Sequence, residues 1–238
     1  LTTAYNHGSG EVGCLQLRGE YLYVAEGTAG VRVYDVANIA NKGVSQRIVT
    51  APFSPLGQGT WIKSKNATCL ALPTNQPIHP DRNRGSLMRE TNLEQPFHPI
   101  YNYLVVVDSE EGLILSDVNT LADGEPRNNF LNRALTWNDN QVLAGARHIT
   151  LGGHFAYIIA DTGLIILNLD NPLQPQVSAT LPLNDGRASA LQFRYLFVTD
   201  ADGLHAIDVT NPEAPKMTPN NRIPLADARR LYVARTYA

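Results

Sequence analysis

Gly203-Leu-His-Ala-Ile-Asp-Val-Thr-Asn-Pro-Glu-Ala-Pro215 is the stretch that decides the fold, because three other segments of the chain repeat its plan. The closest copy is Gly163-Leu-Ile-Ile-Leu-Asn-Leu-Asp-Asn-Pro172, and shorter copies are Gly112-Leu-Ile-Leu-Ser-Asp-Val118 and Gly30-Val-Arg-Val-Tyr-Asp-Val36. A repeated unit that cannot bury its own apolar face stacks on its copies. We therefore expect four similar units packed side by side.

Each copy follows a short run of aromatic and aliphatic residues, such as Tyr195-Leu-Phe-Val-Thr-Asp200. These residue types favour extended chain, and the runs have the length of strands. A glycine then lets the chain reverse with positive φ, and an Asp or Asn accepts local backbone N–H groups where the second strand ends. The residues predicted to form these turns are Gly30, Gly112, Gly163, Gly203, Asp35, Asp117, Asn168 and Asp208. We expect turn formation from them, and neither catalysis nor metal binding.

Each unit also has a candidate strand before this pair and another after it. The first carries an alternating pattern, found in Cys14-Leu-Gln-Leu17, Cys69-Leu-Ala-Leu72, His148-Ile-Thr-Leu151 and Ala190-Leu-Gln-Phe193. The last is expected at residues 45–50, 131–135 and 176–180, and after Pro215. Four antiparallel strands per unit make a propeller blade. The predicted fold is an all-β propeller with four recognisable units and the start of a fifth at residues 225–234.

The patterns that begin at Gly163 and Gly203 resemble LVIVD repeats, a bacterial and archaeal family of secreted or surface β-propeller modules. The first two units depart from that pattern, with Asn38-Ile39 and Asn119-Thr120 where Asn-Pro is expected. The resemblance implies a propeller fold and an extracellular, cell-surface or periplasmic location. It implies no particular activity.

Length and composition favour one globular domain over residues 1–238, and the resemblance implies that it is exported. The chain of 238 residues is 43% hydrophobic, with a net charge of −3 and a pI near 6.1, so the basic surface of a nucleic-acid-binding protein is missing. No apolar run approaches the roughly 20 residues that a membrane-spanning helix needs, so we expect no membrane insertion. The sequence begins without a signal peptide, and an exported protein requires one. We expect a mature or excised portion of a longer protein that continues beyond Ala238.

Residues 73–100 form the largest insertion into the repeat pattern. They contain five of the 15 prolines, two of the six histidines and the basic residues Arg82, Arg84 and Arg89. This composition cannot form a core, and insertions on one face of a repeat protein are common binding elements. We expect an extended loop that contacts other protein subunits or domains, although a buttress for a neighbouring domain fits equally well.

Cysteines and histidines supply the candidate site residues. Cys14 and Cys69 occupy the same position in adjacent inner strands, where we expect their Cα atoms to lie beyond the roughly 7 Å that a disulfide tolerates. This favours two free, partly buried thiols over a disulfide. His148 shares their register, together with Ala190, so Cys14, Cys69 and His148 could hold a metal in the central channel, although a hydrogen-bonded filler role is favoured for His148. His79 and His98 are candidates for ligating a haem in trans.

Catalytic signatures are missing from the sequence. It contains neither a Gly-x-Ser-x-Gly motif nor a phosphate-binding Gly-x-x-x-x-Gly-Lys-Ser/Thr motif, and no cofactor is predicted. The preferred hypothesis is a non-catalytic extracytoplasmic module that docks or scaffolds proteins. One alternative is the propeller part of an exported multihaem redox assembly. A second is a metal-dependent hydrolase or lactonase that works in the central channel.

Overall fold

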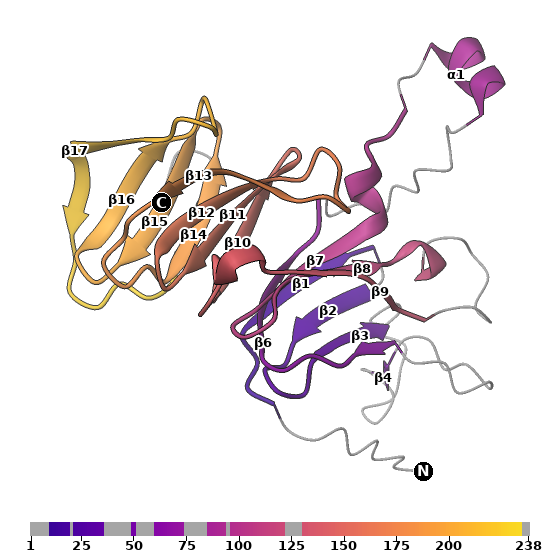
Figure 1. Cartoon of the computed structure of the whole chain (residues 1–238), viewed down its shortest axis with the longest axis horizontal. Coiled ribbons are helices and arrows are strands. Elements are labelled where there is room, and N and C mark those ends of the chain that lie inside the picture. Colours follow the sequence, from indigo (N-terminus) through magenta and orange to yellow (C-terminus); the bar gives the residue numbers. More distant parts are fainter. Residues whose placement is uncertain are drawn as a thin grey trace.

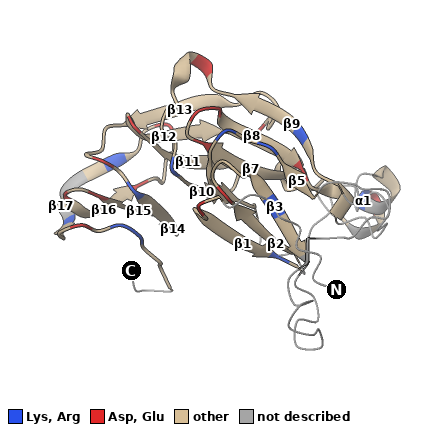
Figure 2. Ribbon diagram, turned by 90° about the horizontal axis from the view of Figure 1, so that it is seen from below, with Lys and Arg blue, Asp and Glu red and all other residues tan. Residues whose placement is uncertain are grey.

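The computed structural model describes residues 10–19, 21–35, 49–50, 60–73, 85–93, 96–121 and 130–234. Within these residues the chain folds into four antiparallel sheets, each with its strands in sequence order from an inner to an outer strand. Figure 1 shows the sheets fanning out from their inner strands, and Figure 2 shows the same arrangement from below. The predicted all-β propeller of four-stranded blades is confirmed.

The strands of the four blades are five or six residues long, except for two short strands in blade 1 and a longer outer strand in blade 4. Blade 1 contains β1 (Cys14–Arg18), β2 (Tyr21–Ala25), β3 (Val31–Asp35) and β4 (Val49–Thr50), and β5 (Trp61–Ile62) also pairs with β3. Blade 2 contains β6 (Ala67–Ala71), β7 (Tyr103–Asp108), β8 (Gly112–Asp117) and β9 (Asn132–Trp137). Blade 3 contains β10 (His148–Gly152), β11 (Phe155–Ala160), β12 (Gly163–Asn168) and β13 (Gln176–Leu181). Blade 4 contains β14 (Ala188–Gln192), β15 (Tyr195–Asp200), β16 (Gly203–Asp208) and β17 (Lys216–Pro224).

Apolar side chains fill the spaces between neighbouring blades. One buried cluster joins blades 1 and 2, a second joins blades 2 and 3, and a third joins blades 3 and 4. In the third, Ile166 of β12 packs with Leu196 and Val198 of β15, and all three are fully buried. Both faces of the middle strands are therefore covered, which explains why these strands read as continuous apolar runs.

The repeated turns have the backbone conformation that the pattern requires. Gly163 and Gly203 have φ values of 124° and 135°, and a Cβ at either position would lie within 2.3 Å of a carbonyl oxygen of the outer strand. Asp117 and Asp208 accept backbone N–H groups two residues further on. Asn168 makes the same contact, whereas the side chain of Asp35 lies outside the described part of the structure.

Strand pairing fixes which inner-strand residues are equivalent. Cys14, Cys69 and His148 pair with Ala25, Val107 and Ile159, which occupy matching positions in the second strands. In blade 4 the equivalent residue is Ala188, which pairs with Thr199. The prediction of Ala190 for this position is wrong by two residues. Because side chains alternate with a period of two, the shift leaves the residue on the same face, and the hydrophobic pattern cannot detect it.

Cys14 and Cys69 form a disulfide, so the prediction of two free thiols is wrong. Their Cα atoms are 4.7 Å apart and the bond spans 55 residues. The error lies in the assumed geometry, because blades diverge outward while their inner strands converge near the axis. Gly13 allows this approach, since a Cβ there would lie 1.9 Å from the carbonyl oxygen of Thr68.

Several segments differ from the expected blade pattern or add to it. Residues 225–233, where a fifth unit was predicted to begin, contain a turn but no strand. The predicted outer strand at residues 45–50 is described only at β4, because residues 45–48 lie outside the described part. Short helices occur at α1 (Ser86–Asn92), η4 (Pro99–Asn102), η5 (Asn119–Leu121) and η6 (Asp139–Gln141).

Candidate functional site

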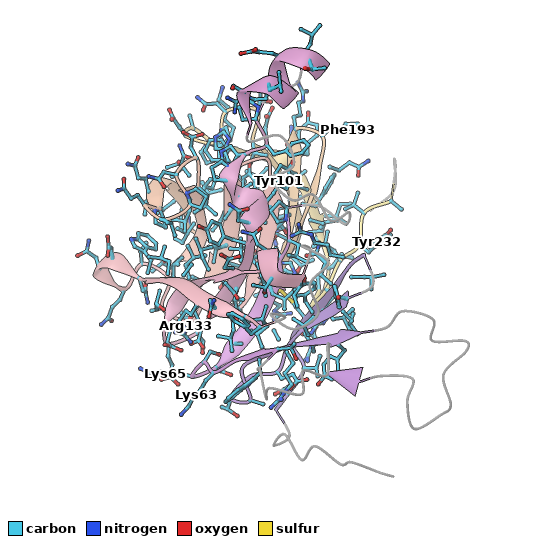
Figure 3. All side chains as sticks on the ribbon, turned by 90° about the vertical axis from the view of Figure 1, so that its right-hand side faces the viewer. Lys63, Lys65, Tyr101, Arg133, Phe193 and Tyr232 are labelled. Carbon is cyan, nitrogen blue, oxygen red and sulfur yellow. A yellow bond between two sulfur atoms is a disulfide. The ribbon has the colours of Figure 1, made fainter. Side chains whose placement is uncertain are left out.

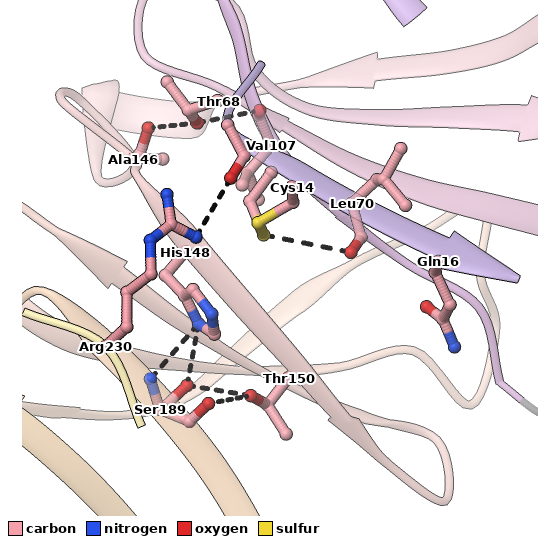
Figure 4. The surroundings of a disulfide bond; sticks show 12 residues. Cys14, Gln16, Thr68, Leu70, Val107, Ala146, His148, Thr150, Ser189 and Arg230 are labelled. Carbon is pink, nitrogen blue, oxygen red and sulfur yellow. Dashed lines mark hydrogen bonds between the residues drawn. A yellow bond between two sulfur atoms is a disulfide. The ribbon is translucent and has the colours of Figure 1, made fainter. Parts of the chain in front are cut away.

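The central channel begins at a disulfide and a histidine from three adjacent inner strands. Cys14, Cys69 and His148 place their sulfur and ring nitrogen atoms within 4.8 Å of one another, as the repeat register predicts (Figure 4). However, the disulfide removes both thiolates, and thiolates are the form in which cysteine binds metals. The metal-ligand set suggested by the sequence is therefore reduced to His148 alone.

His148 is held as a neutral imidazole. Its Nδ1 accepts the backbone N–H of Ser189 at 3.2 Å, which places the ring proton on Nε2. Burial lowers the pKa of His148 to about 4, and the positive charge of Arg230 acts in the same direction. The side chain thus links blade 3 to blade 4 by a hydrogen bond and is uncharged near neutral pH.

We expect His148 to make the fold acid-sensitive. Its pKa falls from 6.5 to about 4 on folding. Between pH 6.5 and pH 4 the histidine is therefore protonated in the unfolded chain but stays neutral in the folded chain. Stability is therefore complete above pH 6.5 and is lost as the pH falls toward 4, by about 1–3 kcal/mol. His148→Ala, which copies Ala188 of blade 4, should flatten this part of the pH profile in urea unfolding. Equal slopes for the two proteins would contradict the assignment.

The end of the 73–100 insertion is fixed to blade 3 by His98. The His98 ring stacks on His154 with centroids 5.7 Å apart, and its Nε2 lies 3.3 Å from Oδ1 of Asp170. Its Nδ1 accepts the backbone N–H of Ile100 at 3.1 Å and caps η4. His154 precedes β11 and Asp170 follows β12, so this contact joins an insertion of blade 2 to the adjacent blade.

Although His98, His154 and Asp170 lie close enough to share a metal, the hydrogen bonds favour a clamp. A neutral imidazole that accepts at Nδ1 carries its proton on Nε2 and offers no lone pair there. For the same reason, haem ligation by Nε2 of His98 would require loss of the cap on η4 or of the contact with Asp170. His79, the other haem-ligand candidate, lies outside the described residues.

Helix α1 lies on the same insertion but apart from the blades. Figures 1 and 3 show it projecting beyond the body of the propeller. Leu87 is 74% exposed, and Leu93, the residue that ends the helix, is 89% exposed. Burial of a leucine contributes roughly 1.5–3 kcal/mol, and neither Leu87 nor Leu93 gains this stabilisation from the blades.

Sequence reasoning missed a buried pair in blade 4. Nε2 of His205 lies 2.9 Å from Oδ1 of Asp200, and the two residues are 7% and 2% exposed. Asp200 Oδ1 also accepts the backbone N–H groups of Asp202 and Gly203. A comparison of the repeats could have revealed the pair. Blade 3 has the apolar residues Ala160 and Ile165 at the positions that Asp200 and His205 occupy in blade 4.

The blades, their inner strands and the channel define a β-propeller. The family model described as LVIVD repeat matches residues 9–50, 145–180 and 190–220, so these three segments are similar to LVIVD repeats. The matches cover the first, third and fourth units, and they confirm the resemblance noted in the sequence. No curated protein matches the chain.

Solved structures support the fold alone. A functionally unknown protein from Desulfotomaculum acetoxidans superposes with a TM-score of 0.53 at 10% identity, covering 89% of this chain and 56% of that one. U3-55K gives a TM-score of 0.50 at 11% identity, covering 87% and 51%. Apo AztD from Citrobacter koseri gives 0.43 at 12% identity, covering 92% and 48%. The chain thus spans about half the length of each.

None of the helices in the described residues has the length and apolar character needed to cross a membrane.

Proposed function

We propose that this chain is a non-catalytic, extracytoplasmic docking module that binds a partner protein through the arm, the name used here for residues 73–100. The observation that carries the proposal is the exposure of Leu87 on α1 and of Leu93 directly after it, on a helix that stands apart from the blades. Exposed leucine side chains on a projecting segment are of the kind that proteins bury in an apolar groove of a partner.

The base of the arm supports this role. His98 clamps the end of the arm on blade 3, and Ile100 of η4 is 2% exposed within the core between blades 2 and 3. A binding element on a fixed base loses less conformational freedom when its partner binds. The propeller then serves as the rigid support that sets where the helix is presented.

Photo-crosslinking tests the contact directly. A benzoylphenylalanine placed at Leu87 or Leu93, in cells that export the protein, should give one discrete crosslinked partner. Phe193 provides a matched control, because it is an exposed apolar residue at 88% exposure in the turn between β14 and β15. Crosslinking with equal yield from all three positions, or from none, would contradict docking through α1.

Charge substitution then measures the contribution of the helix. With the crosslinked protein purified as the ligand, Leu87→Asp and Leu93→Asp together should weaken binding by at least about 30-fold, since each buried leucine side chain contributes more than about 1 kcal/mol at an interface. The melting temperature should stay unchanged because neither side chain packs on the blades. Binding that is insensitive to the double substitution would show that the partner contacts another part of the molecule.

A further inference from the structure

Arginines link the beginnings of the inner strands from one unit to the next. Arg147 Nη1 donates to Asp185 Oδ1 at 3.0 Å, and Arg187 Nη1 donates to Asp227 Oδ1 at 2.9 Å. Each acceptor belongs to an Asp-x-Arg sequence, Asp185-Gly-Arg187 or Asp227-Ala-Arg229. The same contact is therefore made twice, one unit apart, at the same end of the channel.

These arginines converge on a pocket of about 420 Å³ at this end, which we term the channel mouth. Arg147, Arg187, Arg229 and Arg230 line it together with one acidic residue, Asp227. The remaining walls are small or uncharged: Gly13, Cys14, Thr68, His148 and Ala188. The volume lies within the range of small-molecule sites.

Carboxylates neutralise only part of this positive charge. Arg147 is paired with Asp161 and Asp185, Arg187 with Asp185 and Asp227, and Arg229 with Asp227. Arg230 has no carboxylate partner among the described residues, and its Nη1 donates to the backbone oxygen of Gly13 at 3.1 Å. A guanidinium has five N–H donors, so most of those on Arg230 have no acceptor within the part of the chain that the structure describes.

We propose that the channel mouth binds the oxyanion group of a small molecule, a carboxylate or a phosphate, between Arg229 and Arg230. Guanidinium groups bind both types of oxyanion through paired N–H donors. Arg230 reaches across the mouth beside His148 (Figure 4), and its positive charge contributes to the lowered pKa of that histidine. The neutral histidine and the disulfide leave the inner wall without a competing carboxylate.

This site is independent of the arm and goes beyond the docking function. Its ligand enters at the end of the channel where Gly13, Arg187 and Asp227 meet, and none of these residues lies on the insertion. A protein bound at α1 and an anion bound in the channel mouth could occupy the molecule together.

Calorimetric titration with inorganic phosphate and, separately, with succinate tests the proposal. The wild-type chain should bind at least one of them with a dissociation constant below about 1 mM, which corresponds to only about 4 kcal/mol. Arg230→Gln should weaken that binding at least tenfold. Phosphate binding alone would identify a phosphate ester as the ligand class, and succinate binding alone would identify a carboxylate.

Two further variants separate ligand binding from folding. Arg229→Gln removes a guanidinium while leaving the contact between Arg230 and Gly13 intact, and it should also weaken binding. Arg222→Gln removes an arginine of blade 4 that lies outside the channel mouth, and it should bind like the wild type. Absence of saturable binding up to 10 mM anion, or an affinity equal to that of the wild type in both Arg229→Gln and Arg230→Gln, would overturn the proposal.

Discussion

Replacing Cys14 and Cys69 together by alanine should lower the free energy of unfolding by about 4 kcal/mol. The disulfide closes a loop of 55 residues, and the chain-entropy relation assigns a loop of this length about 4 kcal/mol of stabilisation. Net stabilities of single domains are only about 5–15 kcal/mol, so the effect is large. Both sulfur atoms lie at the junction of blades 1 and 2, and the bond therefore holds the innermost strands of these blades together.

Urea unfolding of the double variant and of reduced wild-type protein measures this contribution. The two should unfold at similar urea concentrations, well below that of the oxidised wild type, because both lack the same covalent constraint. Alanine is preferred to serine because Cys69 is 1% exposed, and a buried hydroxyl would add its own cost. An unchanged unfolding midpoint after reduction, with loss of the bond verified by mass, would show that the disulfide adds no stability.

The same reasoning connects the disulfide to the channel mouth. Cys14 follows Gly13, whose carbonyl oxygen accepts from Arg230, and both residues line the proposed anion site. A covalent link between β1 and β6 fixes this wall of the mouth. The double alanine variant should therefore bind anions more weakly than the wild type even where it remains folded.

The repeats were sufficient to predict the blades, because the strand and turn signals occur in every unit and reinforce one another. The pattern could not reveal distances between units. Cys14 and Cys69 were recognised as equivalent, yet their separation depends on how closely inner strands converge. The contacts from Arg147 to Asp185 and from Arg187 to Asp227 were missed for the same reason. They join residues about one repeat apart, and no local rule indicates that these side chains meet.

The arm illustrates a second limit. Its composition predicted an irregular insertion, and the structure shows that it also contains α1 and ends in a contact between His98 and Asp170. A histidine that caps a short helix and contacts a neighbouring blade has no signature in the sequence. Its proline-rich neighbourhood predicts a segment outside the blades but does not indicate where the segment is fixed.

Asp200→Ala should destabilise the protein by about 3–5 kcal/mol. The substitution removes a buried carboxylate that accepts from two backbone N–H groups and pairs with His205. Loss of one member of a buried pair leaves its partner without compensation, which is among the costliest single changes in a folded protein. Asp202→Ala serves as the matched control, since the Asp202 side chain is 43% exposed and its effect should stay below about 1 kcal/mol.

Comparison with blade 3 suggests a second substitution that should restore the stability lost in Asp200→Ala. It separates the contribution of the pair with His205 from that of the turn N–H groups. Blade 3 has Ala160 and Ile165 at the positions of Asp200 and His205, and both are 1% exposed. The double variant Asp200→Ala/His205→Ile copies that arrangement and leaves no buried histidine without a partner. Removing both polar partners is often close to neutral, so urea unfolding should show recovery of more than half of the loss. If the double variant is as unstable as Asp200→Ala, the turn N–H groups account for the stabilisation by Asp200. If the double variant instead regains the lost stability, the Asp200–His205 pair is a polar replacement for the apolar contact found in blade 3. Blade 4 would then differ from blade 3 at these positions for a reason other than stability.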